Sequence, residues 1–186
     1  FFNPSLRTLA SMQAAMARLG GTSFVITPGG SSWKLETRTG VVMDGDASEH
    51  VREAIPVLGG YADVLGVRAF ASGSDLAADL ADGSFRQIAA LSPVPVVNLE
   101  SAIDHPCQAL ADWKTLDDLA VPRHGKLVLT WANHPKALPH AVPAAVLRMA
   151  ALRGMEVTVL SPEAYALPQS LVAEALHFKA LCEGQR

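Results

Sequence analysis

The sequence is poor in cysteine, in net charge and in long apolar runs, and each shortage argues against a class of function. Its two cysteines, Cys107 and Cys182, stand far apart without the spacing of a metal site, so we expect reduced thiols. A net charge of -3 gives no reason to expect a nucleic acid or a membrane as partner. No apolar run approaches the roughly 18 residues of a membrane-spanning helix, and no signal-peptide pattern is seen. We therefore expect a cytoplasmic protein.

The composition is that of a globular chain. Hydrophobic residues make up 49% of the 186 residues and charged residues 18%, which allows one or two domains with a real core. The chain has no initiator methionine and begins inside an apolar segment, Phe1-Phe2. We interpret these two residues as the end of a buried strand, and we expect the chain to be a fragment.

Segments with the signals of strands alternate with segments with the signals of helices. Strands are predicted over residues 23–27, 64–68, 94–98, 126–131 and 156–160, and helices over residues 6–19, 48–59, 84–92, 106–119, 138–153 and 169–182. Residues 31–46 are predicted to form a loop with a short extended stretch at 41–43. The alternation favours an α/β fold of two domains, each with a parallel sheet flanked by helices. We place them at residues 1–120 and 121–186, and expect both to be incomplete, because two strands do not make a stable sheet domain.

The first eight residues, FFNPSLRT, combine a helix start with groups that bind anions. Pro4 pushes the residue before it out of the helical region, and Ser5 stands at the N-cap of the helix that follows. The free N–H groups of the first turn, two hydroxyl groups and Arg7 converge on one point, which suits a phosphate. An ordinary capped helix with a surface arginine explains these eight residues equally well.

Polar side chains also follow other predicted strands. Arg68 ends one strand, His105 and Gln108 open the helix after another, and His134 follows a third. Because ligands bind at the carboxyl edge of open α/β sheets, the joint pattern points to one site. The alternatives are a surface salt bridge for Arg68 and a capping role for His105. Trp33 in a glycine-flanked loop indicates a contact with another molecule, or else it covers the core of its own domain.

In this order and spacing, FFNPSLRT, Gly66-Val67-Arg68 and His105-Pro106-Cys107-Gln108 resemble the aspartate/ornithine carbamoyltransferase family over essentially the whole chain. Within it, Trp33, VMDGDASEH at 42–50 and TWANHPK at 130–136 are similar to the branch that acts on Nα-acylated ornithine. The resemblance implies transfer of a carbamoyl group from carbamoyl phosphate to the δ-amine of an N-acylornithine, in arginine biosynthesis. It also implies a homotrimer that needs no cofactor and no metal.

The resemblance implies the roles of individual residues as well. Arg68, His105 and the Thr8 hydroxyl are the expected catalytic groups, because they would stabilise the negative charge that builds on the carbamoyl oxygen. Trp33 is expected to reach the site of a neighbouring subunit. The acylornithine is expected to contact Glu100, His134 and Ser48. Carbamoyl phosphate is expected to contact Ser5, Leu6 through its backbone N–H, Arg7, Thr8, Trp33, Arg68, His105 and Gln108.

Two positions depart from the pattern of the family. Leu9 stands where the family usually carries a second arginine, which leaves a catalytically degenerate paralogue that binds carbamoyl phosphate as an alternative, or shifts the task to Lys34. Ser48 stands where the acetyl-specific pattern has a glutamate and the succinyl-specific pattern a proline. A glutamate would repel the carboxylate of a succinyl group, whereas Ser48 would not. We therefore favour N-succinylornithine over N-acetylornithine as substrate, with ornithine or aspartate as lesser alternatives.

Overall fold

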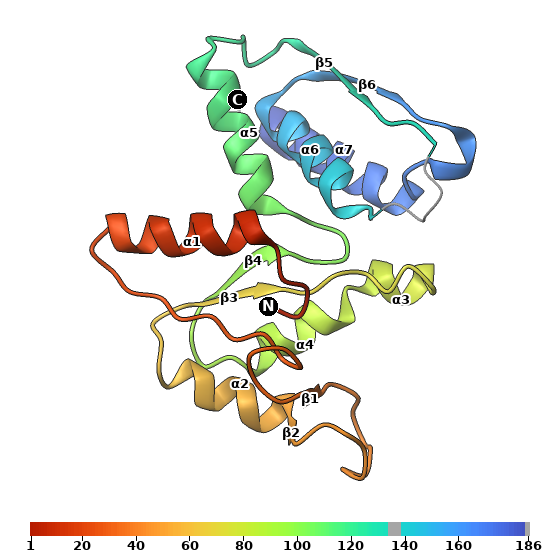
Figure 1. Cartoon of the computed structure of the whole chain (residues 1–186). Helices are drawn as coiled ribbons and strands as arrows, with labels where there is room; N and C mark the ends of the chain where they lie inside the picture. The colour runs from red at the N-terminus through yellow and green to blue at the C-terminus, as the bar shows by residue number, and fades with distance from the viewer. Residues whose placement is uncertain (134–138, 185–186) are drawn as a thin grey trace. The chain divides into compact units, whose positions relative to one another are not determined.

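The structure is a computed structural model that describes residues 1–133 and 139–184 (Figure 1). By its internal contacts the chain divides into two compact units, one of Phe1–Phe70 with Ala81–Ser101, the other of Ala71–Leu80 with Ala102–Arg186. Each unit is described below by itself. These units are defined by contacts and do not test the predicted boundary between two domains at residues 120 and 121, which stays a prediction. Within the described residues, no helix has the length and apolar character to cross a membrane.

The first unit contains short parallel sheets with helices around them, as the α/β prediction requires. Strand β3 pairs with β4, and β1 pairs with β2, both in parallel. The elements are α1 (Leu6–Arg18), β1 (Leu35–Glu36), β2 (Glu49–His50), α2 (Val51–Gly59), β3 (Leu65–Arg68), α4 (Gly83–Leu91) and β4 (Val96–Glu100).

The core of the first unit gathers around the end of β3. Val67 packs there with Val51 and Ile55 of α2, with Ala69 and with Ile88 of α4, and all five are buried. The side chain of Phe2 is partly buried against this cluster. The bond from the Phe2 N–H to the Arg68 carbonyl therefore anchors the chain start beside β3, but Phe1-Phe2, which we interpreted as the end of a buried strand, is half-buried and is not part of a strand in this structure.

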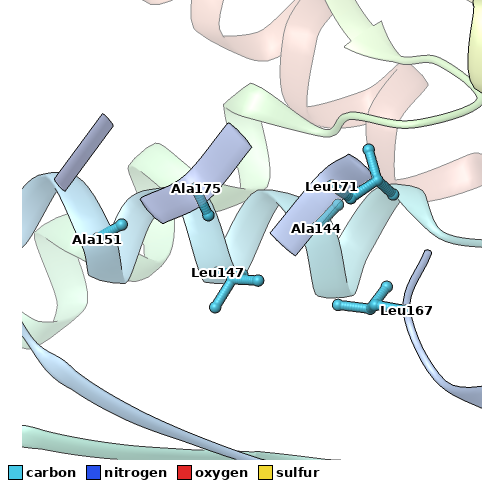
Figure 2. Close-up of a cluster of buried hydrophobic side chains, with 6 residues drawn as sticks. All are labelled: Ala144, Leu147, Ala151, Leu167, Leu171 and Ala175. Atoms are coloured by element: carbon cyan, nitrogen blue, oxygen red, sulfur yellow. The ribbon is translucent and has the colours of Figure 1, made fainter. Parts of the chain in front are cut away.

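The second unit packs two helices closely against each other and beside a parallel two-stranded sheet (Figure 1). Its elements are α3 (Leu76–Ala81), α5 (Pro106–Asp118), β5 (Lys126–Thr130), α6 (Ala141–Arg153), β6 (Glu156–Leu160), the 3₁₀ turn η1 (Glu163–Tyr165) and α7 (Gln169–Gly184). Helix α6 ends at Gly154, whose positive φ of 80° suits glycine. Figure 2 shows the core where α6 meets α7, in which alanines let the helices approach; its buried residues are Ala144, Leu147, Ala151, Leu167, Leu171 and Ala175.

Most predicted helices and strands are confirmed, and most of the errors concern segments whose structure depends on pairing with another strand. Residues 23–27 are not a strand, because they pair with no other strand in the described part of the chain. The extended stretch of the loop lies at 35–36 rather than at 41–43, because residues 35–36 pair with β2. Helix α2 starts three residues later than predicted, because residues 49–50 belong to β2. The sequence patterns did not reveal α3. Strand β5 alternates exposed and half-buried residues, and α6 contacts it.

Candidate active site

The start of α1 has the geometry that the first eight residues predict. Ser5 is extended (φ -131°, ψ 127°), and its Oγ accepts the Thr8 N–H at 3.5 Å. Arg7 is exposed, and the side chain of Leu6 is 84% exposed. The first turn contains no acidic residue, so its N–H groups and the helix dipole present a positive end to solvent. This end of the helix can accept an anion.

Arg68 lies at the end of β3 as a buried cation. It is 8% exposed, its Nη2 donates to Oε2 of Glu100 at 2.6 Å, and its Nη1 donates to the main-chain carbonyl of Asn3. Its Cζ lies 4.2 Å from the centre of the Phe70 ring, a cation–π contact. Its Nε is buried without a hydrogen-bond partner in the described structure. Arginine offers more donors than these contacts use, so Arg68 retains capacity for an anion.

The register of β3 and β4 explains why Arg68 and Glu100 meet. The pairing shifts after Val67, so that Arg68 lies opposite Glu100, and the Ala69 N–H donates to the Glu100 carbonyl at 2.9 Å. Both side chains end their strands at the same carboxyl edge of the sheet. The surface salt bridge that we considered for Arg68 is therefore a buried ion pair. We expected Glu100 at the acylornithine, and that role stays a prediction beside its pairing with Arg68.

Asn3 and Phe70 belong to this cluster, and the sequence analysis missed both. The Asn3 side-chain oxygen accepts the Phe70 N–H at 2.8 Å. The Asn3 carbonyl and the Phe70 ring both contact Arg68. The signal that was available is the position of Asn3, two residues before the N-cap of a helix that we expected to bind phosphate. Its contact with Arg68 joins residues 65 positions apart, which no local pattern reveals.

Trp33 lies in the segment just before β1, and Ser48 lies just before β2. Trp33 is 61% exposed, so it does not cover the core of its unit, and its Nε1 donates to Oε2 of Glu49 at 3.1 Å. Lys34 pairs with Asp46, which lowers the pKa of that carboxyl group. Lys34 is engaged by an exposed acid in this structure, and its role as a substitute for the second arginine stays a prediction. Ser48 is exposed and lines an open depression together with Gly40, Val41, Met43, Glu49, His50, Arg52 and Glu53.

His105 and Gln108 lie in the second unit, at the start of α5. His105 occupies the N-cap position, but its side chain makes no capping hydrogen bond, and its main-chain N–H donates to Asp104 Oδ1 at 2.9 Å. Gln108 is exposed, and its Nε2 donates to Asp112 at 2.8 Å. Their meeting with Arg68 around one ligand stays a prediction. His134 lies outside the described residues.

Burial changes the acidity of two groups beside His105. It raises the pKa of the Asp104 carboxyl, against the opposing effect of Arg148, whose guanidinium lies 3.0 Å away. Burial also raises the pKa of the Cys107 thiol, and the charge of Asp104 adds to that effect. A thiol with a raised pKa stays protonated near neutral pH and is a poor nucleophile. The start of α5 therefore offers hydrogen-bonding groups rather than a covalent catalyst.

Comparison with known proteins identifies the class. The family model for the aspartate/ornithine carbamoyltransferase, carbamoyl-P binding domain, matches residues 1–118. The N-acetylornithine carbamoyltransferase of Xanthomonas campestris pv. campestris is 46% identical over 165 residues, which are 87% of this chain and 48% of the relative. The N-succinylornithine carbamoyltransferase of Bacteroides thetaiotaomicron is 41% identical over 175 residues, 94% of this chain and 55% of the relative. The chain thus spans about half the length of these relatives.

Solved structures agree with the sequence matches. An acetylornithine transcarbamylase complexed with acetylcitrulline has a TM-score of 0.90 and 40% identity, over 98% of this chain and 56% of its own. A Glu→Ser mutant of an N-acetyl-L-ornithine transcarbamylase, complexed with carbamyl phosphate and N-succinyl-L-norvaline, has a TM-score of 0.90 and 42% identity over the same shares. The chain belongs to the aspartate/ornithine carbamoyltransferase family. Within that family it falls in the N-acylornithine branch, as the resemblance of its motifs implied.

Proposed function

We propose that the protein transfers the carbamoyl group of carbamoyl phosphate to the δ-amine of an Nα-acylated ornithine, giving an N-acylcitrulline and phosphate in arginine biosynthesis. The observation that carries the proposal is Arg68, a buried cation at the carboxyl edge of a parallel sheet with an unpartnered Nε–H in the described structure. Ligands bind at this edge in open α/β sheets. The match of residues 1–118 to a carbamoyl-phosphate domain supports this assignment.

In this proposal the start of α1 holds the phosphate group together with Arg68, which also reaches the carbamoyl oxygen. Ser5 and Thr8 supply hydroxyl groups, Leu6 supplies its backbone N–H, and Arg7 supplies an exposed guanidinium. A guanidinium binds phosphate oxygens through paired hydrogen bonds, and a helix N-terminus adds a partial positive charge. The charge on the phosphate is therefore held before and after the reaction, which stabilises it as a leaving group.

The reaction then requires positioning and charge stabilisation. The δ-nitrogen forms a bond to the carbamoyl carbon, the bond from that carbon to the phosphate oxygen breaks, and the departing phosphate takes the electron pair and the proton of the amine. Arg68, His105 and the Thr8 hydroxyl stabilise the negative charge on the carbamoyl oxygen, as an oxyanion hole does. Gln108 assists in holding the carbamoyl group. Orientation of the two substrates supplies much of the remaining rate.

We infer that the acyl group is succinyl. The resemblance places Ser48 where acetyl-specific enzymes carry a glutamate, and an enzyme with a Glu→Ser exchange was solved with N-succinyl-L-norvaline. Ser48 is exposed and lines an open depression with one cation, Arg52, and two carboxylates, Glu49 and Glu53; Ser48 itself adds no carboxylate that would repel a succinyl group. N-acetylornithine is the close second candidate, favoured by the 46% identity to an N-acetylornithine enzyme. Ornithine and aspartate are lesser candidates.

Leu9 favours a candidate of another class. It is half-buried in α1 and supplies no charge where the family usually has a second arginine. A paralogue that binds carbamoyl phosphate without turnover is therefore the alternative. The homotrimer, with Trp33 reaching a neighbouring subunit's site, and the cytoplasmic location belong to the same proposal as the enzyme.

The test is a parallel assay of the full-length protein with carbamoyl phosphate and N-succinylornithine, N-acetylornithine, ornithine or aspartate. We expect phosphate release with an acylated ornithine, fastest with N-succinylornithine. Release with none of the four contradicts the enzyme and leaves the binding paralogue. Release with free ornithine alone contradicts the assignment to acylornithine.

Ser48→Glu tests the choice of acyl group. The new carboxylate is expected to lower kcat/KM for N-succinylornithine by about tenfold or more, the effect of a like charge worth about 1.4 kcal/mol, and to spare N-acetylornithine. The matched control is Ser84→Glu, which adds the same charge at an exposed position in the first turn of α4. If both variants keep the substrate preference of the parent protein, Ser48 does not select the acyl group.

A further inference from the structure

Asn3 lies where the two parts of the proposed phosphate site join. It stands two residues before Ser5, the N-cap of α1, and it also contacts the end of β3. The Phe2 N–H donates to the Arg68 carbonyl at 3.0 Å, and the Asn3 side chain accepts the Phe70 N–H at 2.8 Å. The chain start is thus bonded along β3 through one main-chain bond and one side-chain bond.

The main chain and the side chain of Asn3 bond to different groups. The Asn3 carbonyl accepts Nη1 of Arg68. The amide oxygen of Asn3 accepts the Phe70 N–H. The Phe70 N–H is partly buried, so losing its acceptor would be costly, and this second bond fixes the backbone at Phe70.

Asn3 therefore acts on Arg68 from two sides. It holds the guanidinium directly through its carbonyl, and it holds the backbone of Phe70, whose ring lies 4.2 Å from the Arg68 Cζ. Glu100 closes the third side at 2.6 Å. These contacts hold the guanidinium on three sides, and its Nε is the guanidinium nitrogen without a hydrogen-bond partner in the described structure. A fixed donor costs no reorganisation when an anion arrives.

We propose that Asn3 is a positioning residue that fixes the guanidinium of Arg68 relative to the start of α1, so that both bind one phosphate group of the substrate. This inference rests on the proposed function. A neutral side chain suits this place because Glu100 already pairs with Arg68, and a second carboxylate would add to the negative charge that repels an anionic substrate. Asparagine is short, neutral and a hydrogen-bond acceptor, and it meets all three requirements.

The first test is Asn3→Ala in the full-length protein. We expect kcat/KM for carbamoyl phosphate to fall about tenfold, the order expected for one lost hydrogen bond, with KM for the acylornithine changed less than twofold. The dissociation constant of inorganic phosphate, measured by calorimetry, should rise by a similar factor. The control is Gln87→Ala, which removes another side-chain bond to the main chain of the same unit, from Nε2 to the Thr37 carbonyl at 2.9 Å.

The second variant, Asn3→Asp, keeps an acceptor for the Phe70 N–H and adds a negative charge. We expect it to fold with the stability of the parent protein and to bind phosphate more weakly than Asn3→Ala. Phosphate affinity equal to that of the parent protein overturns the proposal, as does an Asn3→Ala variant that behaves like Gln87→Ala. If the parent protein turns over no substrate but binds phosphate in an Asn3-dependent way, the proposed function fails and the positioning role stands.

Discussion

Arg68 in the first unit and Arg153 in the second are held in nearly the same way. Each is buried, each gives one Nη to a carboxylate, and each gives the other Nη to a main-chain carbonyl. Each guanidinium also lies near an aromatic ring, at 4.2 Å from Phe70 and 5.7 Å from Trp113. In each, Nε has no partner in the described part of the chain. By local environment alone, either arginine qualifies as a binding group.

The two arginines differ in their place in the fold. Arg68 ends a strand at the edge where α/β sheets bind ligands, and its partner Glu100 is 8% exposed. Arg153 ends helix α6, where a cation is favoured by the helix dipole, and its partner Asp117 is 44% exposed. Arg153 has a sufficient structural reason to be there, because it ties α6 to the end of α5 and to the Val121 carbonyl. A buried arginine is thus a functional candidate only when its position in the fold agrees.

The largest expected effect comes from exchanging each arginine for lysine. Lysine keeps the charge but loses the planar fork that makes the paired contacts. Arg68→Lys is expected to lower kcat/KM by about 10²–10³-fold, the cost of removing one donor to a developing oxyanion. Arg153→Lys should lower the free energy of unfolding by roughly 1–3 kcal/mol and leave kcat/KM unchanged.

Steady-state kinetics and chemical denaturation of the full-length variants check both halves of this expectation. Activity is compared per folded molecule, so that lost stability is not counted as lost catalysis. The comparison breaks down if Arg153→Lys loses activity as strongly as Arg68→Lys. It also breaks down if Arg68→Lys retains kcat/KM within tenfold of the parent protein.

The sequence foretold Arg68 better than it foretold the contacts of Arg68. The apolar run before it and the parallel-sheet pattern placed it at the end of a strand, because those signals are local. Its partners Asn3 and Glu100 lie 65 and 32 positions away, and the register shift after Val67 that brings Glu100 opposite it depends on tertiary pairing. The sequence did not reveal the cluster of Arg68, Asn3 and Glu100 because these residues lie far apart along the chain.

The difference between local signals and distant partners also explains which helices and strands were predicted correctly. Helices α1, α5 and α6 carry their own caps, prolines or terminal glycine, and their predictions needed nothing else. A strand requires a partner, so residues 23–27 failed despite a suitable pattern. The exposure of Trp33 shows that it does not cover the core of its unit, and its contact with another molecule stays a prediction. Its bond to Glu49 depends on the pairing of β1 with β2, which the glycine-rich loop concealed.

A smaller effect is expected from the rings beside the two arginines. Phe70→Leu removes the aromatic face near Arg68 and should lower kcat/KM roughly two- to fivefold, since a cation–π contact is worth about 0.5–1 kcal/mol. Trp113→Leu removes the ring that lies near both Arg123 and Arg153, and should lower the midpoint of thermal unfolding without changing kcat/KM. Equal kinetic losses in the two variants would mean that ring contacts report general damage rather than the orientation of Arg68.

The smallest effect is a pH dependence confined to the second arginine. The hydrogen bond from Arg153 lowers the pKa of the Asp117 carboxyl, and the charge of Arg153 and the Trp113 indole add to this. Because the folded pKa lies below the unfolded value of about 3.9, the pair stabilises the protein above that pH and loses its effect as pH falls through the folded pKa.

The measurement is the difference in unfolding free energy between the parent protein and Asp117→Asn, followed from pH 6 down to pH values below the ordinary range of aspartate. Taking the difference cancels the titration of the other carboxyl groups. We expect the difference to be modest, because Asp117 is exposed to solvent and salt screens the pair, and to shrink as the pH falls. A difference that grows on acidification would show that the ion pair of Arg153 does not stabilise the fold, and would remove the structural explanation that sets Arg153 apart from Arg68.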